Sequence, residues 1–310
     1  MRIVFIGTGK IGVPTLTALE KSGHELLAVV TQPDKPAGRT HRLKASPIKE
    51  SAALANLSIL QPLRIKDPDS IAQIAALQPE IVVVVAYGQI LPVALLTLPR
   101  LGCLNLHASL LPKWRGAAPI PAAIAAGDQE TGITVMYVDQ GLDTGDILLQ
   151  RATTILPGEN SAALEDRLAM IAPDALLGAL QLLESGKAPR VPQDHAKATY
   201  APKLNRESGQ IDWSEPAQVI ERKIRAFNPW PGAFTAIALK SGGPRNLKIF
   251  SATVVDRREQ AGEVLREGAG IIVGAGNGAL LLGEIQLEGK RRMHSAEFAR
   301  GYPGLSKLVR

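Results

Sequence analysis

Asn105 and His107 are the residues whose types and spacing most directly suggest chemistry. They stand at the end of an apolar run, and in a strand their side chains point to one side while Leu104 and Leu106 point to the other. A side-chain amide beside an imidazole can hydrogen-bond an oxyanion that develops on a carbonyl. Downstream, Asp143 supplies a carboxylate that can orient and charge the imidazole. Because this set contains no nucleophile for a covalent intermediate, it predicts direct acyl transfer to an amine.

Several longer strings around this pair match the pattern of one enzyme family. In chain order they are Gln32–Arg39, Val84–Gly88, Asn105–Pro112 continued by Lys113–Pro119, Gly141–Asp146 and Ala226–Pro231. Together they resemble the 10-formyltetrahydrofolate-dependent formyltransferases over nearly the whole chain, and most closely the members that act on tRNA. Long ungapped strings in matching order make this resemblance specific.

The resemblance implies an enzyme that transfers the formyl group of 10-formyltetrahydrofolate to the α-amine of initiator methionyl-tRNA, for translation initiation. The family's catalytic residues fall on Asn105, His107 and Asp143, which would hold a tetrahedral intermediate. The folate would be a co-substrate, and neither a metal nor NAD is implied.

The resemblance also places the folate pocket on the segment that follows the strand. Its residues are Ser109, Leu110, Leu111 and Pro112. Apolar side chains can flank a flat pterin there, and backbone groups can hydrogen-bond it. An ordinary loop with buried leucines would give the same pattern.

A compact basic segment follows the second predicted strand, between residues 35 and 44. On its own, such a charge run indicates a solvated surface loop. The resemblance implies instead a clamp on the tRNA acceptor stem, because arginine pairs with phosphate and stacks on exposed bases. The implied contacts are Lys35, Arg39, Arg42 and Lys44, and the role of His41 is open.

The overall charge agrees with a polyanionic partner. The chain of 310 residues has a formal net charge of +6 and a pI near 9.5. From Gly209 onward it has 15 Lys and Arg against 10 Asp and Glu, whereas the earlier residues have 20 against 19. Nearly all the excess positive charge therefore lies in the C-terminal third, as expected for a part that contacts nucleic acid.

The single cysteine and the N-terminal sequence indicate the cellular setting. Cys103 allows neither an intrachain disulfide nor a cysteine-based zinc site, and a small buried residue is its simplest interpretation. Asp139, Asp143 and Asp146 share a Gly-rich loop, but their spacing is not that of an EF-hand loop, so no metal site is expected.

Neither a signal peptide nor a membrane-spanning run is visible in the sequence. We therefore expect a soluble, cytoplasmic monomer without membrane contact.

Alternating apolar and amphipathic stretches predict the fold of the first part of the chain. Strands are predicted at Ile3–Ile6, Leu26–Thr31, Ile81–Ala86, Leu101–His107 and Ile133–Val138, and helices at residues 12–22, 46–55, 67–77, 118–126 and 161–185. This alternation favours an α/β, Rossmann-like, mostly parallel sheet with helices on both faces. Ligands of such sheets bind at the C-terminal ends of strands, where Asn105, His107 and the Tyr87–Gly88 turn fall.

Beyond Gly209 the pattern changes to a helix over Pro216–Ala226 and short alternating runs between Gly-rich turns. This predicts a small β-barrel, and the resemblance implies an OB-like one. Its candidate phosphate contacts are Arg222, Lys223, Arg225, Arg291 and Arg292. We expect a formyltransferase catalytic domain over residues 1–189, a linker over 190–208 and a C-terminal β-barrel, tRNA-binding domain over 209–310.

One motif favours a different class of protein. Gly7–Gly12 matches GxGxxG between a predicted strand and helix, with Asp34 about 20 residues further on, as in dinucleotide-binding folds. An NAD-dependent oxidoreductase is therefore an alternative. The competing interpretation is that the glycines only allow a tight strand-to-helix turn, with Asp34 in a loop past the second strand.

Two further alternatives are enzymes that contain the same catalytic residues but act on other substrates. Formyltransferases that act on a small amine, such as an amino sugar nucleotide, and folate-dependent hydrolases share the Asn/His/Asp core. The basic segment and the basic C-terminal third argue against them, because a small substrate needs neither. A non-catalytic RNA-binding protein is disfavoured by the intact Asn105, His107 and Asp143.

Overall fold

The computed structural model describes residues 1–37, 42–237, 244–267, 270–302 and 308–309. The chain divides into two compact units. The first comprises Met1–Pro119, Glu130–Thr154 and Glu165–Pro202, and the second comprises Ile120–Gln129, Ile155–Leu164 and Lys203–Arg310. Residues 190–202, expected as part of a linker, thus have their contacts within the first unit. The domain limits expected from the sequence remain a proposal.

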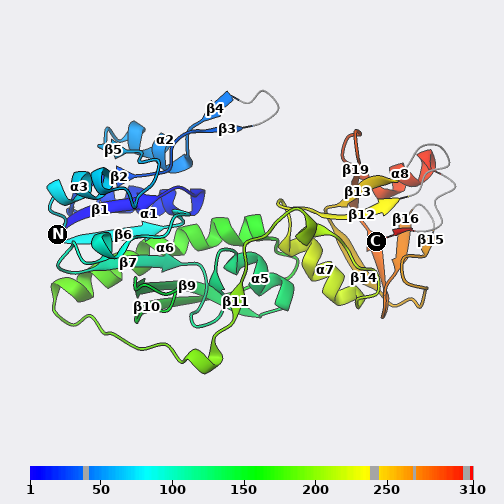
Figure 1. Cartoon of the computed structure of the whole chain (residues 1–310). Helices are drawn as coiled ribbons and strands as arrows, with labels where there is room; N and C mark the ends of the chain where they lie inside the picture. The colour runs from blue at the N-terminus through cyan, green and yellow to red at the C-terminus, as the bar shows by residue number, and fades with distance from the viewer. Residues whose placement is uncertain (38–41, 238–243, 268–269, 303–307, 310) are drawn as a thin grey trace. The chain divides into compact units, whose positions relative to one another are not determined.

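A seven-stranded sheet forms the centre of the first unit (Figure 1). In spatial order its strands are β10 (Ile147–Thr154), β9 (Glu130–Tyr137), β7 (Cys103–His107), β6 (Ile81–Val85), β1 (Arg2–Gly7), β2 (Glu25–Val30) and β5 (Ile59–Leu60). The five strands from β7 to β5 are parallel, and β9 is antiparallel to both of its neighbours. The prediction of a mostly parallel sheet is confirmed.

The predicted helices of this unit are confirmed with small changes of length. They are α1 (Val13–Glu20), α2 (Pro47–Leu54), α3 (Pro68–Ala76) and α6 (Ser161–Glu184), and a short α4 (Val93–Leu96) was not predicted. The start of α2 has a local cause, since the Ser46 hydroxyl accepts a hydrogen bond from the Lys49 amide and Pro47 occupies the first turn.

Both faces of the sheet are covered, which explains its apolar strands. Every residue of β6 is buried. In β1, Val4 and Ile6 pack in a cluster with Leu95 and Cys103, while the alternating residues Ile3 and Phe5 are also buried. A strand that is apolar on both faces belongs in the middle of a helix-covered sheet, and this places the carboxyl ends of β6 and β7 at one edge.

Two further pairs of short strands lie outside the seven-stranded sheet. The basic segment begins and ends in an antiparallel pair of strands, β3 (Lys35–Ala37) and β4 (Arg42–Lys44), so it forms a hairpin where a loop was expected (Figure 1). The strands β8 (Arg115–Gly116) and β11 (Tyr200–Ala201) pair in parallel.

The second unit is rich in strands, as predicted, and these form two antiparallel sheets. One sheet has the order β19 (Met293–His294), β18 (Glu284–Leu287), β13 (Arg245–Ile249), β12 (Ala233–Ile237) and β20 (Leu308–Val309). The other has the order β14 (Ala252–Val255), β17 (Ala279–Leu282), β16 (Gly270–Gly274) and β15 (Val264–Glu267). Their buried residues share one apolar core with α7 (Ala217–Ala226) and α8 (Ser295–Gly301). Helix α5 (Pro119–Ala126) also belongs mostly to this unit.

Candidate active site

Asn105 and His107 lie at the end of β7, next to the antiparallel strand β9. In the register of this pair, Asn105 is opposite Met136 and His107 is opposite Thr134. The imidazole is almost fully enclosed, with 6% of the His107 surface exposed. Asn105 is half-buried, and none of the residues that the structure describes hydrogen-bonds its side-chain amide. The amide of Asn105 is therefore available to a ligand.

Both ring nitrogens of His107 face oxygen acceptors. Nε2 lies 2.8 Å from the backbone carbonyl oxygen of Trp114, and Nδ1 lies 3.6 Å from Oδ2 of Asp143. Since a carbonyl oxygen can only accept a hydrogen bond, Nε2 carries a hydrogen. The second distance is that of an ion pair and is longer than a hydrogen bond. The ring is thus oriented by one firm bond at Nε2, while Nδ1 lacks a close hydrogen-bond partner.

Asp143 reaches His107 from a loop that starts beside the beginning of β7, at the opposite end of that strand from His107. The loop leaves β9 where the Val138 amide donates to the carbonyl of Cys103, at the beginning of β7. It then brings the Asp143 carboxylate to His107, at the end of β7, and Oδ2 accepts a hydrogen bond of 2.8 Å from the Gly116 amide. Asp143 has a φ of 52°, in the left-handed region that Asp tolerates better than most residues.

The other two acidic residues of this loop have different contacts. Asp139 accepts hydrogen bonds from the Gly141 amide and the Thr144 hydroxyl, so it braces the turn. Asp146 lies 3.9 Å from Arg190, whose guanidinium stacks on the Tyr137 ring. Only Asp143 of the three contacts His107.

The segment predicted to bind folate is largely occupied by internal contacts. Ser109 is buried and donates to the Lys113 carbonyl, while its own carbonyl accepts from Thr134 Oγ1. Leu111 is buried, and its amide donates to the same Thr134 oxygen. Leu110 and Pro112 are only half-buried. If this segment meets a folate, side-chain contact therefore falls to Leu110 and Pro112.

Two residues in contact with this site were missed by the sequence analysis, namely Arg115 and Gln193. Gln193 lies in the stretch expected to be a linker, yet its amide bonds the Asp143 loop and the buried Arg115 guanidinium. The sequence did contain a signal for Arg115, because this arginine lies within the string Lys113–Pro119, soon after the strand that carries Asn105 and His107. Nothing in the local sequence marks its partner Gln193.

The glycine-rich turn Gly7–Gly12 has a structural explanation. A Cβ on Gly7 would lie 2.9 Å from the Val85 carbonyl oxygen, and the Gly9 amide donates to the Ala86 carbonyl. Asp34, which would hold a ribose in a dinucleotide site, accepts hydrogen bonds from Lys49 and Gln61 instead. These contacts support the interpretation that the glycines only allow a tight strand-to-helix turn, which lies close against the end of β6.

The basic hairpin presents its side chains to solvent. Lys35, Arg42 and Lys44 are exposed, and Lys35 also hydrogen-bonds Gln32. Arg39 and His41 lie outside the described residues. The exposed cations fit both a solvated surface and a nucleic-acid contact.

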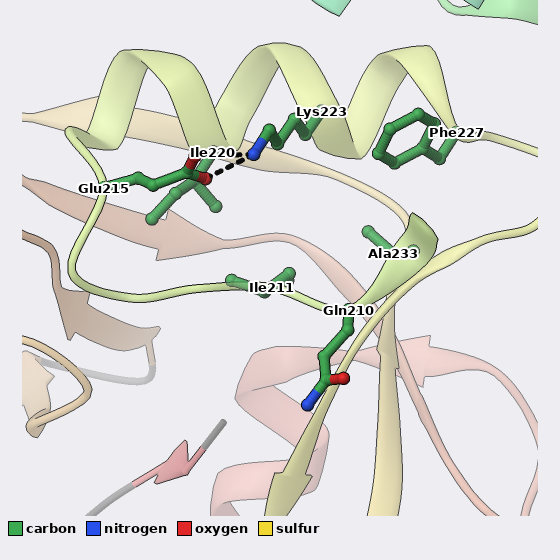
Figure 2. Close-up of a pocket in the computed structure, with 8 residues that line it drawn as sticks. Gln210, Ile211, Glu215, Ile220, Lys223, Phe227 and Ala233 are labelled. Carbon is green, nitrogen blue, oxygen red and sulfur yellow. Dashed lines mark hydrogen bonds and ion pairs between the residues drawn. The ribbon is translucent and has the colours of Figure 1, made fainter. Parts of the chain in front are cut away.

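Several cations of the second unit are engaged in ion pairs. Arg291 pairs with Glu297, Arg292 with Glu284, Arg225 with Glu221 and Lys223 with Glu215. Figure 2 shows the last of these pairs beside a small pocket, with Lys223 and Ile220 on α7 and Phe227 just past its end. Arg222 differs, because its Nε is buried without a hydrogen-bond partner among the described residues.

Cys103 is a buried thiol, as predicted, and burial raises its pKa to about 12. Across the described ranges, no three His, Cys, Asp or Glu side chains form a group that could hold a metal ion. Nor does any helix within those ranges have the length and apolar character needed to cross a membrane.

Comparison with known proteins adds sequence evidence. A family model described as "Formyl transferase" matches residues 1–180, and one described as "Formyl transferase, C-terminal domain" matches residues 203–303. Methionyl-tRNA formyltransferase of Geobacter sulfurreducens is 45% identical over 303 residues, covering 97% of this chain and 94% of that protein. The enzyme of the same name from Methylacidiphilum infernorum is 47% identical over 305 residues, covering 97% and 95%.

Solved structures agree at the level of the fold. The crystal structure of WlaRD, a sugar 3N-formyl transferase, in the presence of dTDP and 5-N-formyl-THF superposes with a TM-score of 0.67 at 18% identity. The match covers 94% of this chain and 99% of that one.

Proposed function

Because the chain belongs to the formyl transferase family, we propose that it transfers the formyl group of 10-formyltetrahydrofolate to the α-amine of methionyl-tRNA for translation initiation. Two relatives of that name match almost end to end at 45% and 47% identity. The observation that carries the proposal is the meeting of Asn105, His107 and Asp143 at one end of β7 in such a chain.

The reaction needs no covalent intermediate with the protein. The amine nitrogen attacks the formyl carbon, the carbonyl oxygen becomes an oxyanion, and the bond from carbon to N10 of the folate then breaks. The proton lost by the amine is taken up by N10. Asn105 and His107 hydrogen-bond the oxyanion in this scheme, and loss of one such donor typically costs on the order of 10²–10³ in rate.

The geometry of His107 suggests a different role for each of its two ring nitrogens. Nε2 is engaged by the Trp114 carbonyl, so it orients the ring. Nδ1, 3.6 Å from Asp143, is the nitrogen that can address the oxyanion. With a hydrogen on both nitrogens the ring is an imidazolium, and the Asp143 carboxylate compensates its charge. In this proposal Asp143 also relays the amine proton toward N10.

The identity of the formyl donor is inferred from the family. A tetrahydrofolate-derived donor agrees with the family, and the fold-level relative was crystallised with 5-N-formyl-THF. In our proposal 10-formyltetrahydrofolate is the donor, and the segment from Ser109 to Pro112 lines its pocket, with Leu110 and Pro112 in contact. No metal and no NAD take part.

The acceptor is assigned to methionyl-tRNA because a small amine would leave the basic hairpin without a role. Lys35, Arg42 and Lys44 are exposed cations of that hairpin, and Arg39, between its strands, completes the proposed tRNA contacts. We propose a catalytic domain over 1–189 and a tRNA-binding domain over 209–310, joined by a linker over 190–208 whose first part, up to Pro202, packs with the first unit. The protein is proposed to be a monomer that works in the cytoplasm.

One assay tests the function directly. The purified protein is incubated with 10-formyltetrahydrofolate and either methionyl-tRNA or an amino sugar nucleotide, and the formylated product is identified. Formylation of methionyl-tRNA alone is expected. Formylation of the amino sugar nucleotide would assign the chain to the small-amine enzymes, and formate release without acceptor would indicate a hydrolase.

A further inference from the structure

Gln193 is buried within a stretch of chain that is otherwise exposed. Only 5% of its surface is accessible, whereas Val191, Pro192, Asp194 and His195 on either side are exposed. Burial of a polar side chain is costly unless its hydrogen bonds are satisfied. The contacts of Gln193 therefore indicate what holds it there.

The Gln193 amide uses its full hydrogen-bonding capacity. Nε2 donates to the carbonyl oxygens of Asp143 and Gly145, at 2.9 and 2.8 Å. Oε1 accepts from Nε and Nη2 of Arg115, at 3.0 and 2.7 Å. A primary amide has two donor hydrogens and an oxygen with two lone pairs, so all four positions are taken. A carboxylate or a hydroxyl in this place could not satisfy both carbonyls and the guanidinium.

Arg115 links this amide to the backbone groups that hold the catalytic side chains. The residue before it, Trp114, provides the carbonyl that bonds His107 Nε2, and the residue after it, Gly116, provides the amide that bonds Asp143 Oδ2. Arg115 itself is 1% exposed, and its described partners are neutral: Gln193 Oε1 and Nδ1 of His195. Gln193 thus bridges the two segments that set the relative position of His107 and Asp143.

Backbone pairing fixes the same stretch to Arg115. The Arg115 amide donates to the Thr199 carbonyl at 2.9 Å, and the Ala117 amide donates to the Ala201 carbonyl at the same distance. A Cβ on Gly116 would lie 2.6 Å from the Ala201 carbonyl oxygen, so the two chains are in close contact. This pairing anchors the chain at Thr199–Ala201, independently of the Gln193 side chain.

We propose that Gln193 is a positioning residue for formyl transfer, which holds the Asp143 loop against Arg115 and so sets the distance between Asp143 and His107. This inference rests on the proposed function for its catalytic consequence. Its geometric basis, the four bonds of one buried amide, is independent of that function. Gln193 has no contact with His107 and is not assigned a chemical step.

The substitution Gln193→Glu separates positioning from stability. The carboxylate can still accept from Arg115 and supplies the anion that this buried guanidinium lacks, which offsets the two donated bonds that are lost, so the melting temperature should change little. It cannot donate to the carbonyls of Asp143 and Gly145, and these would face a negative charge. A shift of about 1 Å in a reacting group can cost ~10²-fold in rate. We expect kcat to fall by about 10- to 100-fold, while KM for methionyl-tRNA stays nearly constant.

The matched control is Asp194→Asn, one residue along the chain. Asp194 is exposed, accepts from the Ala196 amide and pairs with Lys197, and asparagine can keep the first contact. Wild-type kinetics are expected for this variant. Hydrogen–deuterium exchange on the full chain provides a readout that needs no substrate: amides of residues 139–146 should exchange faster in Gln193→Glu than in the wild type or the control.

The outcomes distinguish the inference from the function. Wild-type kcat for Gln193→Glu, or unchanged exchange of residues 139–146, would overturn the positioning role. A loss of activity that is fully explained by a lowered melting temperature would also overturn the positioning role, since Gln193 would then be merely structural. If the wild type formylates no methionyl-tRNA, the proposed function fails, and the exchange experiment still decides whether Gln193 holds the loop.

Discussion

Oδ2 of Asp143 lies 3.6 Å from Nδ1 of His107, although the loop that carries Asp143 departs from the opposite end of the strand that carries His107. The loop must run back along the strand to make this contact. It is held there by the Gly116 amide at the Asp143 side chain and by the Gln193 amide at the Asp143 and Gly145 carbonyls. The catalytic arrangement therefore depends on segments that are distant in the sequence.

Asn105→Ala and His107→Ala should each lower the turnover number for methionyl-tRNA by about 10²–10³, because each removes one donor to the oxyanion. Steady-state formylation kinetics measure the effect, and circular dichroism shows whether the fold is retained. Asn105→Ala is the cleaner variant, since no described residue bonds the Asn105 amide. Turnover within severalfold of the wild type for either folded variant would remove that residue from the mechanism.

Asp143→Asn should lower kcat strongly while the loop stays in place. The asparagine oxygen can still accept from the Gly116 amide, but the negative charge beside His107 is lost. Asp146→Asn is the matched control, because Asp146 pairs with Arg190 at 3.9 Å and lies in the same loop. If both variants lose activity equally, or if tRNA affinity collapses in Asp143→Asn, Asp143 acts as a brace of the loop.

Arg42→Ala combined with Lys44→Ala should weaken tRNA binding and flatten its salt dependence, by about one slope unit for each phosphate that is no longer neutralised. Arg291→Ala should change both quantities little, because Arg291 is paired with Glu297. The measurement is tRNA affinity at several salt concentrations, together with kcat/KM. Wild-type tRNA affinity and salt dependence in the Arg42→Ala, Lys44→Ala protein would show that the hairpin is an ordinary solvated surface.

Cys103 should not react with thiol reagents in the native protein near pH 9, although the usual pKa of a cysteine is 9.0. Burial raises the Cys103 pKa to about 12, so the reactive thiolate is scarce and also inaccessible. Because the folded-state pKa is above the unfolded value, this group's contribution to stability is complete below about pH 9 and declines as the pH rises toward 12. Thiol titration before and after denaturation checks the first point; rapid labelling of native protein would contradict the burial.

Much of the first unit follows from local patterns in the sequence. The two-sided apolar run Ile81–Val85 has the pattern of a central strand, and the helix predicted at residues 46–55 matches α2 to within a residue at each end. Strand β10 was missed, because half of its residues are exposed at the edge of the sheet and show no strong apolar pattern. The basic segment was expected as a loop, since Lys35, Pro36 and all of β4 are exposed and their pairing leaves no hydrophobic signature.

The amino-acid sequence alone specifies which chemical groups are available: an amide and an imidazole on one side of a strand end, a carboxylate in a Gly-rich loop, and positive charge toward the C-terminus. These are properties of residue type and short-range periodicity, which a strand or turn converts directly into direction. The resemblance already favoured Asp143, but the folded arrangement was needed to show that Asp143, and neither Asp139 nor Asp146, contacts His107, and to bring Gln193 into the site. Those choices depend on hydrogen bonds between segments far apart in the chain, and such bonds leave no periodic trace in either segment.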